Sequence, residues 1–324
     1  MNNSIKDING IQVGHAQNYE AGTGCSVIII RKGAVAGVDV RGAAPGTRET
    51  DLLDPTNTVE KVHAIYLSGG SAFGLDGAAG VMEFLEENNI GFQAGAVKVP
   101  IVSGAVIFDL DIGDSSIRPD KKMGYQACLN IANTDNTKTG NGCIGAGTGA
   151  TVGKYYGINR CMKGGLGTAS IKTGDLIVGA LVIVNAFGDI VNPANGKVIA
   201  GALDVGKKQF AHPNQLLDTR LFKENSPFMR NTTLGVIATN AQLSKAEAKR
   251  LSMSAHDGFA RCIIPSHTLY DGDVIFSLAT GELKSNLNQL NILAAHVISL
   301  AIQNAVFNAT AMFGIPAHSD LEES

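Results

Sequence analysis

The sequence predicts an α+β protein, built as a four-layer α/β/β/α sandwich, and three observations lead to this fold class. Short apolar runs rich in β-branched residues recur along the chain and are bounded by Gly, Asn or Asp, which is typical of strands. Longer stretches with apolar residues at helical spacing lie between them. The first strands follow one another with no helix between, which favours layered sheets covered by helices over a doubly wound parallel sheet.

Seven runs are predicted as strands: residues 25–31, 34–40, 63–67, 105–110, 176–184, 234–239 and 274–280. The first helix follows the glycine-rich segment S-G-G-S-A-F-G, and its apolar residues at helical spacing are Leu75, Ala79, Met82 and Leu85.

The second helix begins at Ser244, because S-K-A-E places Glu247 three residues later and forms a capping box. Its buried stripe is predicted to be Ala248, Leu251, Ala255 and Phe259. The last helix is predicted over residues 287–311, with Leu290, Leu293, Val297, Ala301 and Ala305 as its buried row. Residues 203–230 are charged, contain two prolines and lack an apolar period, so we expect a mobile surface segment there.

Composition limits the possible partners. The 324 residues contain no stretch that resembles a linker, so one large domain or two fused halves are both permitted, and we expect a single domain over residues 1–324. The net charge is −3 with no run of like charge, which argues against nucleic acid or an anionic membrane as partner and favours a small-molecule ligand. Residues 1–4 lead directly into polar sequence, so we expect neither a signal peptide nor an uncharged apolar run of the roughly 18 residues that span a bilayer. These features predict a soluble, cytoplasmic protein.

Neither a metal nor an organic cofactor is expected. The five cysteines form no C-x-x-C pair and are predicted to be buried, reduced thiols, and the seven histidines show no H-x-x-x-H spacing. Gly140, Gly142 and Gly145 fit G-x-G-x-x-G, but they follow the polar run N-T-D-N-T-K-T, whereas a dinucleotide fingerprint follows an apolar strand. The glycine clusters are interpreted instead as places where backbone N–H groups approach a substrate carbonyl.

The most informative segment is M-R-N-T-T-L-G-V-I-A-T-N, residues 229–240. It places an Asn-Thr bond, between Asn231 and Thr232, at the entrance of an apolar run. A threonine hydroxyl is a poor nucleophile unless a base lies beside it, and the α-amino group of the same threonine becomes such a base once the preceding bond is cut. Threonine at a strand entrance is also ordinary in sheets, so other features must support this interpretation.

Three further features supply chemistry. Asp271 and Asp273 flank a glycine before an apolar strand; the D-G pair alone is typical of a turn, yet two carboxylates this close raise the proton affinity of at least one. Asn185 ends an apolar run, where its carboxamide could cap a loop or donate to a developing oxyanion. Lys154 also lies among mostly apolar neighbours in the sequence, in G-A-T-V-G-K-Y-Y-G.

Taken in order along nearly the whole chain, these segments resemble the self-cleaving L-aminopeptidase/D-esterases, a family that includes β-peptidyl aminopeptidases and nylon-oligomer endo-hydrolases. The resemblance is carried by G-V-D-V-R-G, A-I-Y-L-S-G-G-S-A-F-G-L-D-G-A-A-G, P-I-V-S-G-A-V-I-F-D-L, G-A-G-T-G-A-T-V-G-K, N-T-T-L-G-V-I-A-T-N and the D-G-D strand. It implies a fold like that of N-terminal-nucleophile hydrolases. It also implies a homo-oligomer of αβ units, a tetramer or larger.

By this resemblance the precursor is cut between Asn231 and Thr232, into an α chain of residues 1–231 and a β chain of residues 232–324 that begins with the nucleophile. The N-T-T motif is similar to that of the nylon-oligomer branch, whereas the aminopeptidase branch usually has Gly-Ser at the cut. Lys154 and Asn185 match positions around the nucleophile, and Asp271 and Asp273 match the family's paired acidic or hydroxyl residues.

One position departs from the family pattern. Many members have Tyr in the V-I-Y-D motif, where its hydroxyl helps to stabilise the tetrahedral intermediate, but this chain has Phe108. Asn185, or backbone N–H groups of Gly69, Gly70 and Ser71, would then stabilise the oxyanion, and one lost donor costs about 10²-fold or more in turnover.

The resulting hypothesis is a self-processing amidohydrolase or aminopeptidase that acts on small amides, peptides or esters through an acyl-enzyme on an N-terminal threonine. Asp271 and Asp273 would orient its amine and Lys154 would add positive charge. Two alternatives remain open: a self-cleaving acyltransferase resembling ornithine acetyltransferase, whose Thr-Met-Leu style motif is absent here, and a non-catalytic relative of the same fold.

Overall fold

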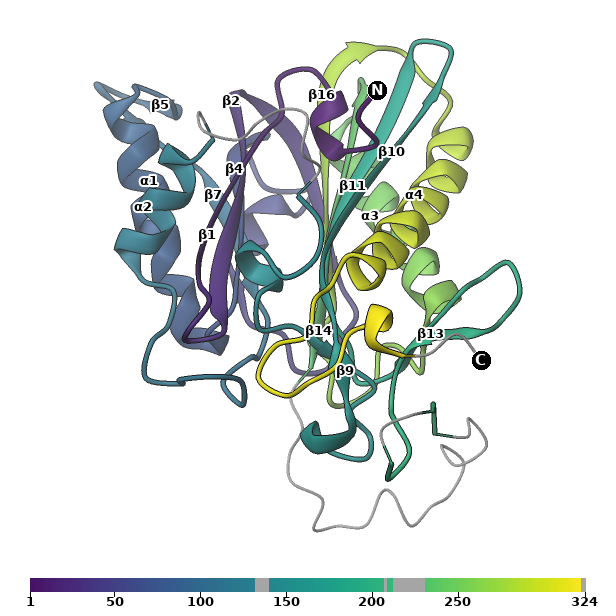
Figure 1. The fold of residues 1–324 in the computed structure, drawn as a ribbon. Helices are drawn as coiled ribbons and strands as arrows, with labels where there is room; N and C mark the ends of the chain where they lie inside the picture. Colours follow the sequence, from purple (N-terminus) through teal and green to yellow (C-terminus); the bar gives the residue numbers. More distant parts are fainter. Residues whose placement is uncertain (132–139, 207–208, 212–230, 322–324) are drawn as a thin grey trace.

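The computed structural model describes residues 1–131, 140–206, 209–211 and 231–321, and its centre is a mixed β-sheet (Figure 1). Within these residues the sheet has nine strands. Eight of them follow the order β10 (Gly165–Thr173), β11 (Leu176–Asn185), β14 (Thr232–Ala241), β16 (Val274–Leu283), β2 (Thr23–Val40), β4 (Lys61–Ser68), β7 (Val102–Val106) and β3 (Thr47–Arg48), and β1 (Gln12–Asn18) pairs with β2.

Strand β2 joins the two halves of the sheet. Its first part pairs with β4 from Cys25 to Ile29, and its second part pairs with β16 from Val35 to Val40. The register with β4 shifts between Ile29 and Ala34, and Gly33 there has a φ of +71°, a conformation that glycine adopts without strain. The two strands predicted over residues 25–31 and 34–40 are therefore one irregular strand, because the chain bends without leaving the sheet.

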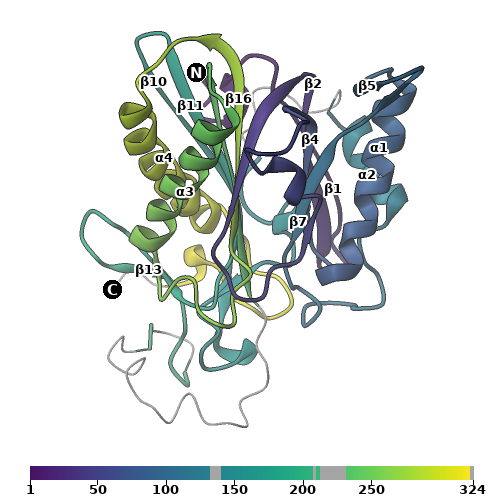
Figure 2. The same ribbon diagram turned by 180° about the vertical axis from the view of Figure 1, so that it is seen from behind.

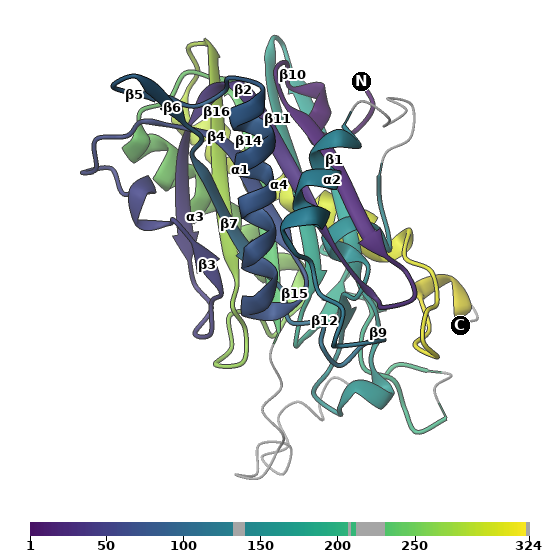
Figure 3. The ribbon, with the colours of Figure 1, turned by 90° about the vertical axis from the view of Figure 1, so that its left-hand side faces the viewer.

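Four layers result, as the sequence predicted. Helices α1 (Gly77–Glu87) and α2 (Lys121–Leu129) lie across β1, β2, β4 and β7 (Figure 3). Helices α3 (Lys245–Cys262) and α4 (Leu287–Phe307) lie side by side over β10, β11, β14 and β16 (Figure 2). Between the helical layers the two halves of the sheet face each other.

Three apolar clusters fill the three spaces between the layers. Strand β14 shows how one strand serves two of them: Leu234 and Val236 face the other half of the sheet, whereas Ile237 packs with the residues under α3 and α4. Because successive side chains point to opposite faces, a strand covered on both sides must be apolar at almost every position. This explains the apolar run L-G-V-I-A at residues 234–238, within β14.

The helix starts follow from local capping. The Ser244 hydroxyl accepts from the Glu247 N–H, and the Glu247 carboxylate accepts from the Ser244 N–H, so the predicted capping box is confirmed. Its predicted stripe, Ala248, Leu251, Ala255 and Phe259, is buried. The last helix ends at Phe307 rather than at residue 311, and of its predicted row only Leu293 is partly exposed.

Helix α4 corrects one expectation. Among the described residues it is the one helix long and apolar enough to cross a membrane by length and composition, although no such run was expected from the sequence. A buried core helix passes the same test, and ten residues of α4, including Leu290, Val297 and Ala305, are buried in the structure.

Shorter elements complete the described chain. The small strands are β5 (Phe92–Ala94), β6 (Val97–Val99), β8 (Thr151–Val152), β9 (Met162–Lys163), β12 (Asp189–Val191), β13 (Val198–Ala200) and β15 (Ile263–Ile264). The 3-10 turns are η1 (Ile5–Asp7), η2 (Asp51–Leu53), η3 (Ser71–Asp76), η4 (Gly145–Gly147), η5 (Ile158–Arg160) and η8 (His318–Asp320). All five cysteines are free and buried. Most of the surface segment predicted over 203–230 lies outside the described residues.

Candidate active site

The site lies where the ends of three neighbouring strands meet. Thr232 is the first residue of β14; across the antiparallel pair it faces Asn185, the last residue of β11. On its other side Asn231 forms a parallel bridge with Asp271, just ahead of β16. The fold thus brings the predicted Asn231, Thr232, Asn185 and Asp271 to one end of the sheet.

The Asn231 carbonyl receives two hydrogen bonds. The Thr232 hydroxyl donates to it from 2.5 Å and the Gly272 N–H donates from 2.8 Å. The Asn231 N–H donates to the Tyr270 carbonyl at 2.9 Å, which fixes the other side of the residue. The Gly272 N–H has the geometry of a donor that stabilises an oxyanion, and the Thr232 hydroxyl, the nucleophile candidate, is held against the same carbonyl group.

Gly272 is a residue whose role was not predicted from the sequence. A Cβ atom at this position would lie 2.5 Å from the Ala44 carbonyl oxygen and 2.7 Å from the Thr232 hydroxyl oxygen. No side chain fits there without movement of the backbone. The glycine between the two aspartates is therefore required by close approach to the threonine, and not only by a turn.

Asn185 is buried and its carboxamide is fully oriented. Its Oδ1 accepts from Lys154 Nζ at 2.7 Å and from the Thr151 N–H at 3.0 Å, and its Nδ2 donates to the Phe108 carbonyl at 3.0 Å. In this structure the Asn231 carbonyl is bound by Gly272 and Thr232, and donation from Asn185 to an oxyanion stays a prediction. Asn185 lies opposite Thr232, with its amide nitrogen at the backbone of Phe108.

Lys154 lies behind Asn185. It is 5 % exposed, and burial lowers the pKa of its ammonium from 10.5 to about 8. Nearby Asp271 and Asp111 favour the charged form and partly oppose this effect. A buried ammonium that donates to Asn185 Oδ1 polarises the carboxamide, so the opposite Nδ2–H becomes a stronger donor. Lys154 acts on the site through Asn185.

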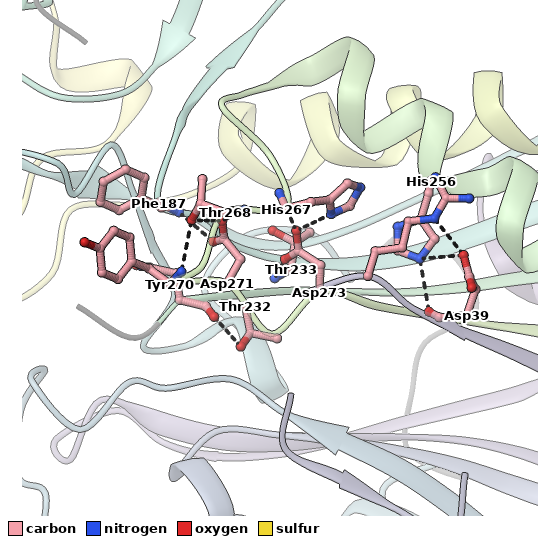
Figure 4. A network of polar contacts seen from close by, with 12 residues as sticks. Asp39, Phe187, Thr232, Thr233, His256, His267, Thr268, Tyr270, Asp271 and Asp273 are labelled. Atoms are coloured by element: carbon pink, nitrogen blue, oxygen red, sulfur yellow. Dashed lines mark hydrogen bonds and ion pairs between the residues drawn. The ribbon is translucent and has the colours of Figure 1, made fainter. Parts of the chain in front are cut away.

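The two aspartates are buried on either side of Gly272 (Figure 4). Asp271 accepts from the Thr268 N–H at 2.9 Å and from the Thr268 hydroxyl at 2.6 Å through Oδ2, while Oδ1 has a longer contact, 3.4 Å, with the Phe187 N–H. Burial, and then the charge of Asp273, raises the pKa of Asp271 to about 6. One raised proton affinity was expected in this pair, and Asp271 shows it.

Asp273 is held by different partners. Its Oδ1 accepts from the Thr233 N–H at 2.7 Å, and its Oδ2 accepts from His267 through both the backbone N–H, at 3.2 Å, and ring Nδ1, at 2.8 Å. His267 was not predicted, because a histidine in a polar loop carries no sequence pattern that would distinguish it. Figure 4 shows it beside Asp273, with His256 and Asp39 further along.

The glycine-rich segment differs from its predicted role. The Gly69 N–H donates to the Gly24 carbonyl, the Gly70 N–H to Asp109 at 2.6 Å, and the Ser71 N–H to the Ile107 carbonyl. These three N–H groups bind protein acceptors, so in this structure they are not presented to a substrate carbonyl. Ser71 still lines the pocket beside Thr232, whereas Gly69 and Gly70 serve the turn into η3.

The glycines of G-N-G-C-I-G also serve packing. A Cβ at Gly142 would lie 2.1 Å from the Asn308 carbonyl oxygen, and one at Gly145 would lie 2.3 Å from the Ser26 hydroxyl. Neither residue is part of the pocket at Thr232. Their expected role in approaching a substrate carbonyl is wrong, because close contacts within the protein explain them.

A pocket of about 350 Å³ opens on the Asn231-Thr232 bond. Among the described residues its walls are Ala44, Pro45, Gly46, Ser71, Ala72, Val106, Ile107, Phe108, Asn231, Thr232, Leu269 and Tyr270. This volume suits a small molecule. Phe108, the residue at the position that departs from the expected tyrosine, lies in the wall of this pocket.

A four-layer sandwich in which a threonine at the head of a central strand opens on such a pocket defines the fold class: this protein has the fold of the N-terminal-nucleophile enzymes. Its structure is similar to that of the L-aminopeptidase D-Ala-esterase/amidase of Ochrobactrum anthropi, which is described as a variant of that fold. The TM-score is 0.73 at 18 % identity, over 97 % of this chain and 88 % of the other.

The chain belongs to peptidase family S58, whose family profile matches residues 3–319. It is 42 % identical to an uncharacterised aminopeptidase of Mycobacterium tuberculosis, over 98 % of both chains. It is also 34 % identical to a 6-aminohexanoate-oligomer endohydrolase of Paenarthrobacter ureafaciens, over 86 % of this chain and 75 % of that protein. The protein is therefore a hydrolase of amide bonds, of the aminopeptidase and amidase type.

Proposed function

We propose that the chain cuts its own Asn231-Thr232 bond and then hydrolyses small amides through an acyl-enzyme on the freed N-terminal threonine. The observation that carries this proposal is the pair of hydrogen bonds on the Asn231 carbonyl, from the Thr232 hydroxyl at 2.5 Å and from the Gly272 N–H at 2.8 Å. The nucleophile, the scissile carbonyl and a backbone donor thus already lie together.

In the first stage, Thr232 Oγ1 bonds to the Asn231 carbonyl carbon while the C–N bond breaks. The hydroxyl proton is transferred to the leaving nitrogen, and an ester between Asn231 and the Thr232 side chain results. The Gly272 N–H stabilises the negative charge on the carbonyl oxygen during this shift. Water then hydrolyses the ester, which restores the hydroxyl and leaves it beside a free α-amino group.

In the second stage, the freed α-amino group accepts the hydroxyl proton while Oγ1 attacks a substrate carbonyl. An α-amino group ordinarily has a pKa of about 7.7–8, so it is partly neutral near pH 7 and can act as this base. The leaving amine departs and water hydrolyses the acyl-enzyme. We place the substrate carbonyl where the Asn231 carbonyl lies in the precursor, so that the Gly272 N–H stabilises both tetrahedral intermediates. Asn185, polarised by Lys154, supplies a second donor when its amide nitrogen turns from Phe108 to the substrate.

Asp271 and Asp273 have different roles in this proposal. Asp273 binds the Thr233 N–H at 2.7 Å and so holds the first residues of the new β chain in the sheet after the cut. Asp271, bridged to Asn231 in the precursor, becomes the neighbour of the new amine. A carboxylate there holds the amine in position for proton transfer.

The substrate class follows from the pocket and from the relatives. We propose linear amides, which include aminoacyl amides and the 6-aminohexanoate oligomers that the similar hydrolase from Paenarthrobacter is named for. The apolar ring of Phe108 and the side chains of Val106 and Leu269 suit a short aliphatic acyl chain.

The proposal is tested with processed protein and a panel of aminoacyl p-nitroanilides and 6-aminohexanoate oligomers. We expect hydrolysis of members of the panel by the wild type and none by Thr232→Ala. Product formation that requires an added amine acceptor would indicate an acyltransferase instead. Equal turnover by Thr232→Ala and the wild type would refute the nucleophile.

A further inference from the structure

Asp273 is held by one residue at two points. Its side chain is 2 % exposed, and Oδ2 accepts from both the backbone N–H of His267 at 3.2 Å and ring Nδ1 at 2.8 Å. The other oxygen accepts the Thr233 N–H at 2.7 Å. The carboxylate therefore connects a loop histidine to the residue that follows the nucleophile.

His267 adopts an uncommon backbone conformation to make these contacts. Its φ is +55°, in the left-handed region that residues with a Cβ rarely occupy, and in this conformation its backbone N–H and its ring reach the same carboxylate oxygen. A strained residue held in place by its surroundings is a frequent feature of active sites. The strain at His267 is offset by two bonds to a buried carboxylate.

The ring of His267 is oriented from both sides. Because Asp273 only accepts, Nδ1 carries the hydrogen, which we assign from the hydrogen-bond network. On the far side the ring packs edge to face against His256, with centroids 4.9 Å apart, and His256 Nε2 lies 3.0 Å from the Asp39 carbonyl oxygen (Figure 4). His256 is completely buried, so this contact fixes where the His267 ring can lie.

The two aspartates differ in their freedom to bind a new donor. The described contacts of Asp273 engage both of its oxygens at 3.2 Å or less. For Asp271 the described contacts engage Oδ2 closely, but the contact of Oδ1 is 3.4 Å long. A new ammonium group at Thr232 would therefore be bound by Asp271, through Oδ1.

We propose that His267 is a positioning residue, which holds the Asp273 carboxylate on the Thr233 N–H. The cut end of β14 then keeps its register, and Asp271 alone binds the new amine of Thr232. This inference rests on the proposed function. A strand end frays unless it is tied down, and after processing the bond from the Thr233 N–H to Asp273 holds the residue next to the nucleophile, in addition to the pairing of Thr232 with Asn185. Loss of His267 would release the carboxylate and misplace Thr232.

The test compares His267→Ala with His267→Asn, because asparagine tolerates a positive φ and its carboxamide can donate to Asp273 as Nδ1 does. We expect His267→Ala to slow self-cleavage and to lower kcat by about 10- to 100-fold, with KM nearly unchanged, because the nucleophile is misplaced rather than the pocket. We expect His267→Asn to recover most of both rates. His63→Ala is the matched control, since this buried histidine accepts from the Ile101 N–H away from the pocket.

Several outcomes overturn the inference. Equal rates for the wild type and His267→Ala, or equal losses for the alanine and asparagine variants, would show that His267 only fills space. If His267→Ala does not fold, His267→Gly takes its place, because glycine adopts this φ without strain. A wild-type chain that is neither cut nor active refutes the proposed function and this inference with it, whereas a normally cut wild type with an unaffected glycine variant refutes the inference alone.

Discussion

Substituting Gly272 by alanine tests the most specific contact in the site. The added Cβ would lie 2.5 Å from the Ala44 carbonyl oxygen and 2.7 Å from Thr232 Oγ1. Ala44 cannot easily move, because its own N–H donates to the Asp271 carbonyl at 2.9 Å. A displacement of roughly 0.9 Å, enough to restore ordinary contact with Ala44, would stretch the 2.8 Å bond from Gly272 to the Asn231 carbonyl beyond useful hydrogen-bond length.

The magnitude follows from these distances. Loss of one donor to an oxyanion costs about 10²- to 10³-fold in rate. The clash itself costs about 1–3 kcal/mol of stability. The matched control is Gly258→Ala in α3, where the added Cβ would lie 2.6 Å from the Ala295 carbonyl oxygen, under α4 and outside the pocket. We expect similar losses of thermal stability in both variants, but slow self-cleavage only in Gly272→Ala.

The assay follows cell-free synthesis stopped at intervals, so that the uncut chain is present at the start. The fraction of cut chain is measured by intact mass, and thermal melting is measured on the same preparations. Cleavage of Gly272→Ala at the rate of Gly258→Ala, with equal melting temperatures, would refute the role of the Gly272 N–H.

Three further predictions concern the nucleophile and the two titrating groups. Thr232→Ser should still cut itself, whereas Thr232→Ala should stay uncut with a melting temperature near that of the wild type. If the intact mass shows that Thr232→Ala is cut, the Thr232 hydroxyl is not the nucleophile of self-cleavage. Because the folded pKa of Lys154, about 8, lies below the usual 10.5, the unfolded chain binds more protons between these values and stability rises with pH there. We therefore expect the free energy of unfolding of the wild type, measured with urea, to rise by about 3 kcal/mol relative to that of Lys154→Met between pH 8 and 10.5. If this difference does not change with pH, the pKa of Lys154 is not lowered by burial. Burial raises the pKa of Asp271 in the uncut chain to about 6, above the usual 3.8, so the folded chain binds more protons between these values and stability falls as the pH rises there. Urea unfolding of uncut Thr232→Ala should therefore show it losing about 3 kcal/mol relative to the Thr232→Ala, Asp271→Asn double variant between pH 3.8 and 6, and a constant difference would contradict the raised pKa.

Sequence patterns predicted the strands that carry the site, because these strands are covered on both faces. Each of β11, β14 and β16 contains a run of apolar residues in a largely buried strand, and the Ser244 capping box marks the start of α3. Where tertiary contact overrides local preference, prediction failed. Strand β10 was missed, since a Cβ at Gly167 would lie 1.9 Å from the Ala301 carbonyl oxygen and the close approach of α4 requires a residue with low strand propensity.

Strand β1 and helix α2 escaped prediction for a related reason. They contact each other at the edge of the sheet, where a Cβ at Gly14 would lie 2.0 Å from the Ala127 carbonyl oxygen. The sequence of β1 is half polar, and α2 has only nine residues. Short elements at an edge bury too few apolar residues to produce a clear period.

The candidate site was partly visible in the sequence. The residues predicted to surround Thr232 were chosen by chemistry and resemblance, and the fold brings Asn185 and Asp271 beside it. The contacts of Gly272 and His267 were not visible, because one is a backbone N–H and the other depends on a left-handed turn that joins residues six apart. A hydrogen-bond partner that is set by backbone geometry leaves no pattern of residue types.

Self-cleavage is tested most directly by the intact mass of the purified chain, followed during incubation. We expect the 33.7 kDa species to give way to two fragments, residues 1–231 and 232–324, the second with threonine as its first residue. A chain that stays whole while it hydrolyses amides would contradict the proposed mechanism.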